Sequence, residues 1–155
     1  MTAIKVSIVD VYPVRMGAGW LEVLVMRRAP GGRCTGSWES VHGHIEPGER
    51  PVDAALRELR EETSLVPQAL YNLSRVESFY QHQNDELAFI PVFVALVAPA
   101  AEFRLGIEHD EAEWLDFSSA STRLAWPRER RALEDIKLLL GTGSAGPLED
   151  VLRIC

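Results

Sequence analysis

The run from Pro51 to Thr63 constrains the fold of this chain more than any other segment, because it combines an apolar stripe with a cluster of acids. At about 100° per residue, three carboxylates share one arc of about 100° on a helix: Glu58, Glu61 and Glu62. An adjacent stripe comprises Val52, Ala55, Leu56 and Leu59. Proline suits the first turn, where its missing N–H needs no partner. The run therefore predicts an amphipathic helix over 51–63 that packs its apolar stripe on a sheet.

The three acids oppose helix formation unless something offsets their charge. Like charges three or four positions apart cost ~0.2–0.5 kcal/mol per pair, and Glu58 makes two such pairs. Arg57 offsets part of this cost, because it lies four positions before Glu61. Hard divalent cations, by contrast, need several carboxylate oxygens that converge on one point. Such a face is either a solvated surface or a cation site, and the small Ala54 in front of the acids leaves room for an ion.

Alternating apolar and polar residues predict strands around this helix. The strand candidates are 4–11, 21–26, 37–41, 74–82, 87–97 and 113–117, with loops at 16–19 and 29–37 and a hairpin at 83–85. Pro47-Gly48 predicts a type II turn before the helix. A second amphipathic helix is expected over 127–140, then a flexible stretch at 141–147 and a short tail at 148–155 that is a candidate for a further helix. This mixture predicts an α+β or α/β sandwich.

Pro91 interrupts the strand predicted over 87–97, which favours a place at a sheet edge or at a bulge. A detached tail from Leu148 would expose further surface. Together, these two features leave a homodimer open.

Composition narrows the class of protein. The chain has 155 residues, of which 46% are hydrophobic and 25% are charged, so a single domain over 1–155 is expected. A net charge of −7 argues against binding to long nucleic acids. No apolar run approaches the ~18 residues of a membrane helix, and the N-terminus has no signal-peptide pattern. Cys34 and Cys155 are too few for a disulfide framework, which favours the cytoplasm.

The segment 43–65 resembles the Nudix box. In order, its matching positions are Gly43, Glu49, Arg57-Glu58-Leu59, Glu61-Glu62 and Leu65. The one departure is Ser64, where the box has glycine. Because serine is strained in the left-handed C-cap that glycine adopts freely, we expect a slightly altered exit from the helix. The resemblance implies membership of the Nudix family, with an α/β fold: an α/β/α sandwich around a mixed sheet.

The resemblance also implies roles for single residues. The implied ligands of Mg²⁺ or Mn²⁺ are Glu58, Glu61 and Glu62, and each is a candidate for the base that activates water. Gly43 would mark a turn where a main-chain oxygen approaches the metal. Arg57 would orient a neighbouring acid, Glu49, through a charge-assisted hydrogen bond. Family members often add an acid from a loop outside the box, and Glu108, six positions before Trp114, resembles that ligand or base. The alternative for Glu108 is an ordinary loop carboxylate.

The implied reaction is hydrolysis of a nucleoside diphosphate linked to another moiety. Ser37–Val41 precede the box glycine and Arg123–Trp126 lead into the last helix. Through these segments the chain, over residues 4–140, loosely resembles the MutT-like bacterial branch of dATP and dihydroneopterin triphosphate pyrophosphohydrolases. That likeness implies a nucleoside or pterin triphosphate that is cut to monophosphate and pyrophosphate. Dinucleoside polyphosphates and nucleotide sugars are alternative substrates, and a nucleotide-binding module without turnover is an alternative function. All three box acids are present, which favours catalysis on a small phosphate ester.

Candidate contacts to the phosphates lie close to the box in sequence. Arg27 and Arg28 end a predicted strand and offer forked donors to phosphate oxygens. His44 is expected to line the turn beside Gly43. A zinc site with His42 is disfavoured, because no third and fourth nitrogen or sulfur ligand is nearby.

Candidate contacts to a base lie near the end of the strand predicted over 74–82. Tyr80 and His82 offer a ring for stacking and a polar edge, together with Phe79 and Gln83. The alternative for the aromatic residues is a place in the core.

Overall fold

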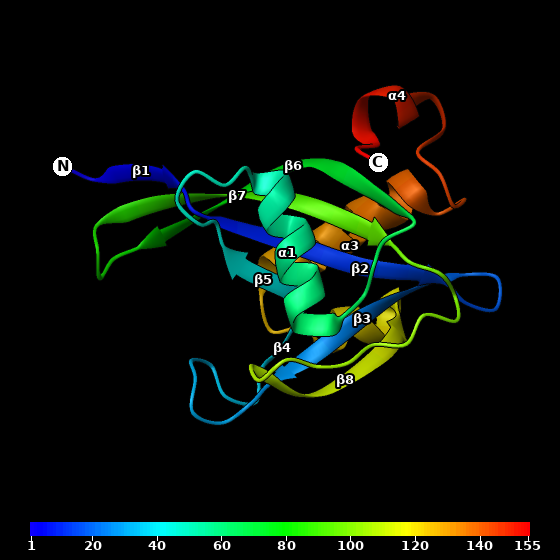
Figure 1. Cartoon of the computed structure of the whole chain (residues 1–155), viewed down its shortest axis with the longest axis horizontal. Coiled ribbons are helices and arrows are strands. Elements are labelled where there is room, and N and C mark those ends of the chain that lie inside the picture. The colour runs from blue at the N-terminus through cyan, green and yellow to red at the C-terminus, as the bar shows by residue number, and fades with distance from the viewer.

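The computed structural model describes residues 1–155 as a mixed sheet with helices on both faces (Figure 1). The strands are β1 (Ala3–Val6), β2 (Ile8–Met16), β3 (Leu21–Arg28), β4 (Trp38–Glu39), β5 (Val41–His44), β6 (Ala69–Gln81), β7 (Glu86–Leu96) and β8 (His109–Asp116). The helices are α1 (Pro51–Thr63), α2 (Phe117–Arg123), α3 (Pro127–Leu140) and α4 (Glu149–Leu152), with a 3₁₀ turn η1 (Gly146–Leu148). The expected α/β/α sandwich is confirmed.

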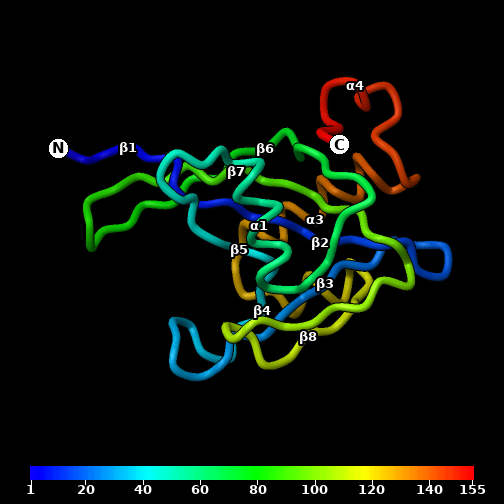
Figure 2. Tube along the Cα trace, in the orientation of Figure 1, coloured from blue at the N-terminus to red at the C-terminus, as the bar shows by residue number.

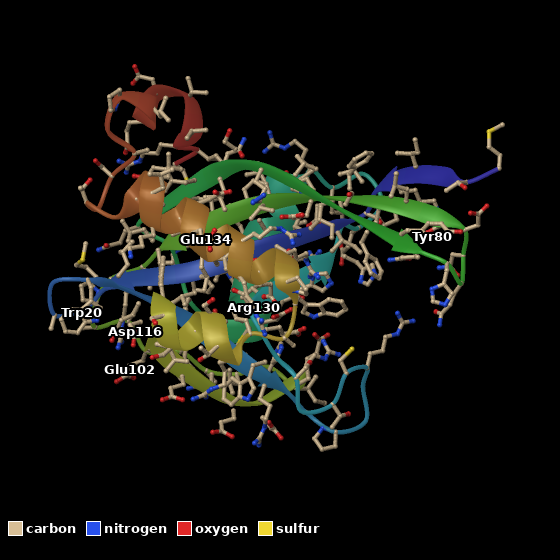
Figure 3. All side chains as sticks on the ribbon, turned by 180° about the vertical axis from the view of Figure 1, so that it is seen from behind. Trp20, Tyr80, Glu102, Asp116, Arg130 and Glu134 are labelled. Carbon is tan, nitrogen blue, oxygen red and sulfur yellow. The ribbon has the colours of Figure 1, made fainter.

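The eight strands form one sheet whose central path is β1-β7-β2-β3-β4. Three strands extend it: β5 pairs with β2, β6 with β7 and β8 with β3. β1 and β2 run parallel to β7, whereas the other pairs are antiparallel. α1 lies across one face, and α2 and α3 cover the other, where Arg130 and Glu134 mark α3 in Figure 3.

Alternation along β2 divides the core between the two faces of the sheet. Val9 and Val11 pack with the apolar side of α1, whereas Tyr12 and Val14 pack with α3. Residues of α1 in the first core are Ala54, Ala55 and Leu59, and residues of α3 in the second are Ala132, Leu133, Ile136 and Leu140. The sheet therefore lies between α1, which carries the acids, and α3.

Both long helices begin and end at the predicted residues, but two predicted strands are each divided. The segment 4–11 forms the exposed β1 and the buried start of β2, on either side of Ser7. The segment 37–41 is interrupted at Ser40, whose hydroxyl donates to the Val11 main-chain oxygen. Helix α2 was not predicted, because its seven residues are too short for a clear periodicity.

Pro91 lies inside the sheet, so of its two predicted places the sheet edge is wrong, whereas an irregularity of the neighbouring strand agrees with the bulge. Phe89 is the last partner of β1 along β7, and Val92 is the first partner of β2. On its other side, Pro91 pairs with Val76, at which the register of β6 resumes after an irregularity that begins at Asn72. Interruptions on both sides explain why β7 tolerates a residue without an N–H.

The C-terminal tail is docked on β6, contrary to the expectation of a detached segment. The Leu70 N–H donates to the Cys155 oxygen at 3.0 Å, and the Ile154 N–H donates to the Leu70 oxygen at 2.7 Å. The Tyr71 hydroxyl donates to the Glu149 carboxylate at 2.8 Å. The tail is therefore not detached and β7 is not an edge strand, while the homodimer itself stays a prediction. None of the helices combines the length and the hydrophobicity that a membrane span requires.

A buried polar network fixes the start of α3 against β2 and β5. Arg128 donates to Asp10 at 2.8 Å, and His42 lies 2.7 Å from the same carboxylate. Glu129 accepts from the Ser40 N–H at 2.6 Å, while its second oxygen has no partner. Burial and the nearby charge of Asp10 raise the pKa of Glu129 well above its usual value.

This raised pKa makes stability depend on pH. Below the ordinary carboxyl pKa, about 4.3, Glu129 is protonated in both the folded and the unfolded chain. Above it, the unfolded chain loses the proton while the folded chain keeps it, so the free energy of unfolding falls by up to about 1.4 kcal/mol per pH unit. The fall ends when the pH passes the raised pKa of the folded state.

Glu129→Gln keeps an oxygen for the Ser40 N–H but cannot ionise. We therefore expect the variant to be more stable than the parent at pH 7, with the difference vanishing towards pH 4. Urea unfolding at several pH values measures this. Glu134→Gln, on the exposed side of the same helix, serves as the control and should follow the parent. A constant difference between parent and Glu129→Gln at every pH would contradict the assignment.

Candidate functional site

Arg57 is the centre of the ion pairs around α1. Its Nε and Nη2 donate to the two oxygens of Glu49, each at 2.9 Å. Its Nη1 donates to Glu58 at 2.7 Å and to Glu61 at 3.3 Å. Its Nη2 also donates to the His44 main-chain oxygen at 2.8 Å, which joins the helix to β5. Arg57 therefore contacts the expected acid, Glu49, together with two of the box acids.

This contact has an electrostatic consequence for Glu49. The hydrogen bond from Arg57 holds the pKa of Glu49 below its usual value, and the Glu46 N–H adds a second hydrogen bond at 2.9 Å. The loop before α1 is thus fixed by a carboxylate that stays ionised. The predicted turn at Pro47-Gly48 is confirmed, because Gly48 has φ 78° and the Glu49 N–H donates to the Glu46 oxygen.

Gly43 lies within strand β5, opposite Val9 of β2, so the prediction of a turn at this position is wrong. Glycine is needed here for space. A Cβ atom on Gly43 would overlap the carboxyl carbon of Glu58 and its neighbouring atoms. Strand β5 therefore passes directly beneath Glu58, and the missing side chain leaves room for that carboxylate between strand and helix.

Glu62 is the most buried of the three box acids, with 4% of its surface exposed. Neither of its carboxylate oxygens has a hydrogen-bond partner. Burial, together with the charges of Glu108 and Glu58, raises the pKa of Glu62 well above its usual value. Burial also raises the pKa of Glu58, although Arg57 opposes the shift. These acids are held at a cost in folding stability, as is common at functional sites.

The loop over 97–108 brings Glu108 to the acids of α1. It runs past the C-terminal end of that helix on its way to β8 (Figure 2). The Arg104 and Gly106 N–H groups donate to the main-chain oxygens of Thr63 and Glu62 at 2.8 and 3.0 Å. The last turn of a helix leaves such oxygens without partners inside the helix, which explains why the loop docks there. The loop and the helix are in close contact at Gly106, because a Cβ atom there would lie 2.8 Å from the main-chain oxygen of Glu61.

Helix α1 ends as glycine would end it, although serine occupies the position. Ser64 adopts the left-handed conformation with φ 60°, and its N–H donates to the Arg60 oxygen at 2.8 Å. The expected altered exit is therefore not observed. The docked loop over 97–108 holds this end of the helix, so the strain at Ser64 is tolerated.

The residues present fit a hard divalent cation. No three His, Cys, Asp or Glu side chains already converge as a closed metal site. Mg²⁺ does not require one, because it usually keeps several waters and takes one or two carboxylates plus substrate phosphates. The donors around α1 are all carboxylate oxygens, which suit Mg²⁺ or Mn²⁺ better than Zn²⁺. The unpartnered, buried oxygens of Glu62 beside Glu58 and Glu108 are the groups that such a cation would satisfy.

The two arginines predicted to meet phosphate have different surroundings. Nη1 of Arg28 lies 3.3 Å from a carboxylate oxygen of Glu39 and 3.8 Å from one of Glu108, so the guanidinium is next to an acid of the candidate site. Arg27 lies 2.8 Å from both Asp110 and Glu111 on β8. The structure therefore brings Arg28, but not Arg27, into contact with the candidate site.

The remaining predicted contacts do not reach the acids of α1. Because Gly43 faces Glu58, the side chains of His42 and His44 lie on the opposite side of β5 and do not line a turn. Tyr80 projects from the β6–β7 hairpin, beyond the start of α3 (Figure 3), and its hydroxyl donates to Asp85 at 3.0 Å. His82 lies in the turn of the same hairpin.

Two further residues, Glu39 and His109, lie near Glu62. Sequence reasoning did not select either of them. Both are buried, and they lie 3.0 Å apart. The one local signal was the position of His109 directly after Glu108. Glu39 had no signal, because its approach to the site depends on the pairing of β4 and β8 with β3.

Comparison with known proteins gives the following matches. A model of the NUDIX domain matches residues 2–136. An octanoyltransferase of Myxococcus xanthus is 36% identical over 113 residues, which cover 72% of this chain and 31% of that protein. The chain thus spans about a third of the length of this relative. The asymmetrical bis(5'-nucleosyl)-tetraphosphatase of Mus musculus is 29% identical over 120 residues, 76% of this chain and 79% of that protein.

One of the solved structures that resemble this protein shares its fold. The dihydroneopterin triphosphate pyrophosphohydrolase of E. coli superposes with a TM-score of 0.69 at 20% sequence identity. The superposition covers 89% of this chain and 99% of that chain.

The contact between Gly43 and Glu58 can be tested by a double-mutant cycle. Gly43→Ala should destabilise the protein by about 1–3 kcal/mol, because the added methyl group overpacks the space that Glu58 fills. In a Glu58→Ala background the methyl group has room, so most of that cost should disappear. Urea unfolding of the four proteins measures both values. An equal cost of Gly43→Ala in both backgrounds would show that Glu58 is not what excludes a side chain there.

Proposed function

Since this chain belongs to the Nudix family, whose domain model matches residues 2–136, we propose that it hydrolyses a nucleoside diphosphate linked to another moiety. The observation that carries the proposal is the group of acids around α1. Glu62 is buried with both oxygens unpartnered, Glu58 lies over the space left by Gly43, and the charge of Glu108 acts on Glu62.

The proposed cofactor is Mg²⁺ or Mn²⁺, held by Glu58, Glu61 and Glu62 with Glu108 as a further ligand or base. When bound, the cation neutralises the diphosphate oxygens and makes a nearby water more acidic. Arg57 forms ion pairs with Glu58 and Glu61 and keeps both side chains in place, but it forms none with Glu62. One carboxylate takes a proton from water, the water oxygen bonds to phosphorus, and the bond from that phosphorus to the bridging oxygen breaks.

The first candidate substrate is a nucleoside or pterin triphosphate, cut to monophosphate and pyrophosphate. The likeness to the E. coli dihydroneopterin triphosphate pyrophosphohydrolase supports it through the fold alone. The second candidate is a dinucleoside polyphosphate, and the 29% identity to the mouse tetraphosphatase supports it. The octanoyltransferase match covers 31% of that protein, so its name carries no argument about the reaction of this chain.

Arg28 is the proposed phosphate contact, because its guanidinium already lies beside Glu108. The proposed compartment is the cytoplasm, in agreement with the two exposed, free cysteines.

A substrate panel tests the proposal and chooses between the candidates. The purified protein is incubated with Mg²⁺ and nucleoside triphosphates, dihydroneopterin triphosphate, dinucleoside polyphosphates or nucleotide sugars, in water enriched in ¹⁸O. Release of pyrophosphate and a monophosphate is expected for the first candidate, and the labelled product identifies the phosphorus that was attacked. Chelation with EDTA should abolish turnover. No turnover on any member of the panel would favour a nucleotide-binding module instead.

Substitution of the box acids tests the proposed site. Glu61→Gln and Glu62→Gln should each lower turnover by about 10²–10⁴-fold, because each removes a ligand or a base. The fold should remain intact, and Glu62→Gln should unfold at a higher temperature than the parent near pH 7, since it removes a buried ionisable group. Glu102→Gln, in the exposed part of the loop over 97–108, is the matched control and should keep the parent rate. Near-parent rates for both box variants would overturn the assignment.

A further inference from the structure

His109 lies between two buried carboxylates. It is the first residue of β8, and its side chain is wholly buried. Its Nε2 is 3.0 Å from Oε1 of Glu39 on β4, which is hydrogen-bond distance. Its Nδ1 is 3.9 Å from Oε2 of Glu62 on α1. One rigid ring therefore spans from the sheet to the helix that carries the proposed metal ligands.

The unpartnered atoms of this arrangement face one another. Nδ1 of His109 has no hydrogen-bond partner, and the same holds for both oxygens of Glu62. Nδ1 and the nearer carboxylate oxygen are less than 1 Å beyond hydrogen-bond reach, so a small rotation of the Glu62 side chain closes the gap. Closure leaves the second oxygen of Glu62 free for another partner.

Glu39 anchors the group from the other side. Its Oε1 lies 3.0 Å from Nε2 of His109 and 3.3 Å from Nη1 of Arg28, and that same Nη1 lies 3.8 Å from Glu108. Two of the acids at the proposed site, Glu62 and Glu108, are therefore each contacted by a residue that Glu39 holds. Only 5% of the Glu39 surface is exposed, so its own orientation is fixed by packing.

Groups behind a metal ligand fix the direction of that ligand. From this geometry we infer that His109, held by Glu39, is a positioning residue that directs the Glu62 carboxylate towards a divalent cation. The inference rests on the proposed function for the identity of the cation site, but not on the choice of substrate. His109 itself contacts neither the cation nor the phosphates.

The test measures Mn²⁺ binding by electron paramagnetic resonance without any substrate. His109→Phe preserves the size of the ring and removes both nitrogens, and it should raise the dissociation constant of Mn²⁺ by about 10–100-fold. His109→Asn, whose amide nitrogen replaces Nδ1, should largely restore binding. His109→Gln, whose amide nitrogen replaces Nε2, should not. Unchanged affinity in a folded His109→Phe protein would overturn the inference.

The matched control is His42→Phe. His42 also contacts a buried carboxylate, at 2.7 Å from Asp10, but it lies on the side of the sheet away from α1. Its substitution should leave Mn²⁺ affinity at the parent value, and an equal loss in both phenylalanine variants would show a general effect on folding and overturn the inference. Should His109→Phe fail to fold, the comparison of His109→Asn with His109→Gln decides, and equal affinities overturn the inference.

Turnover separates positioning from direct catalysis and from failure of the proposed function. For His109→Phe, raising the Mn²⁺ concentration should recover kcat, whereas loss of a base would persist at saturating metal. A parent protein that binds Mn²⁺ but hydrolyses nothing on the panel contradicts the proposed reaction and leaves this inference standing if the variants behave as expected. A parent protein that binds no Mn²⁺ overturns both.

Discussion

The ion pairs of Arg57 are the interaction on which the rest of the site depends. One guanidinium contacts Glu49, Glu58 and Glu61 and also the main-chain oxygen at the end of β5. Without it, the acids of α1 would repel one another along the helix and the preceding loop would lose its anchor. Because a guanidinium has five donors in a fixed plane, it can hold several carboxylates that a lysine could not.

The carboxylates around α1 lie closer together, and are more buried, than folding stability alone would favour. Glu62 and Glu39 are almost fully buried, and Glu58 is pressed against a strand that has no side chain at Gly43. Burying an acid without a full set of partners costs stability, and both oxygens of Glu62 lack a partner, which supports the proposed cation site. On the other face, Glu129 is buried in the network that fixes α3, where it bonds a main-chain N–H.

The sequence predicted local structure well and long-range contacts poorly. Helix α1 is confirmed at both ends, because its apolar stripe and its first-turn proline are features of neighbouring residues. Pro91 was placed at a sheet edge or at a bulge, and it lies inside the sheet, beside an irregularity of β6 and between the stretches that pair with β1 and β2. Ser64 was expected to alter the helix exit, but contacts from a loop about forty residues later hold the left-handed cap. Each error concerns a partner that is distant in sequence.

By itself, the sequence determined the amphipathic helix, the acids on one arc and the likeness to the Nudix box, since spacing along a helix fixes which side chains share a face. Only the tertiary structure decided which other groups meet those acids. It placed the Gly43 backbone beneath Glu58 and set Arg28 rather than Arg27 at Glu108. It also buried His109 between β4 and α1. These contacts depend on strand pairing and loop docking, which bring together residues that no local pattern connects.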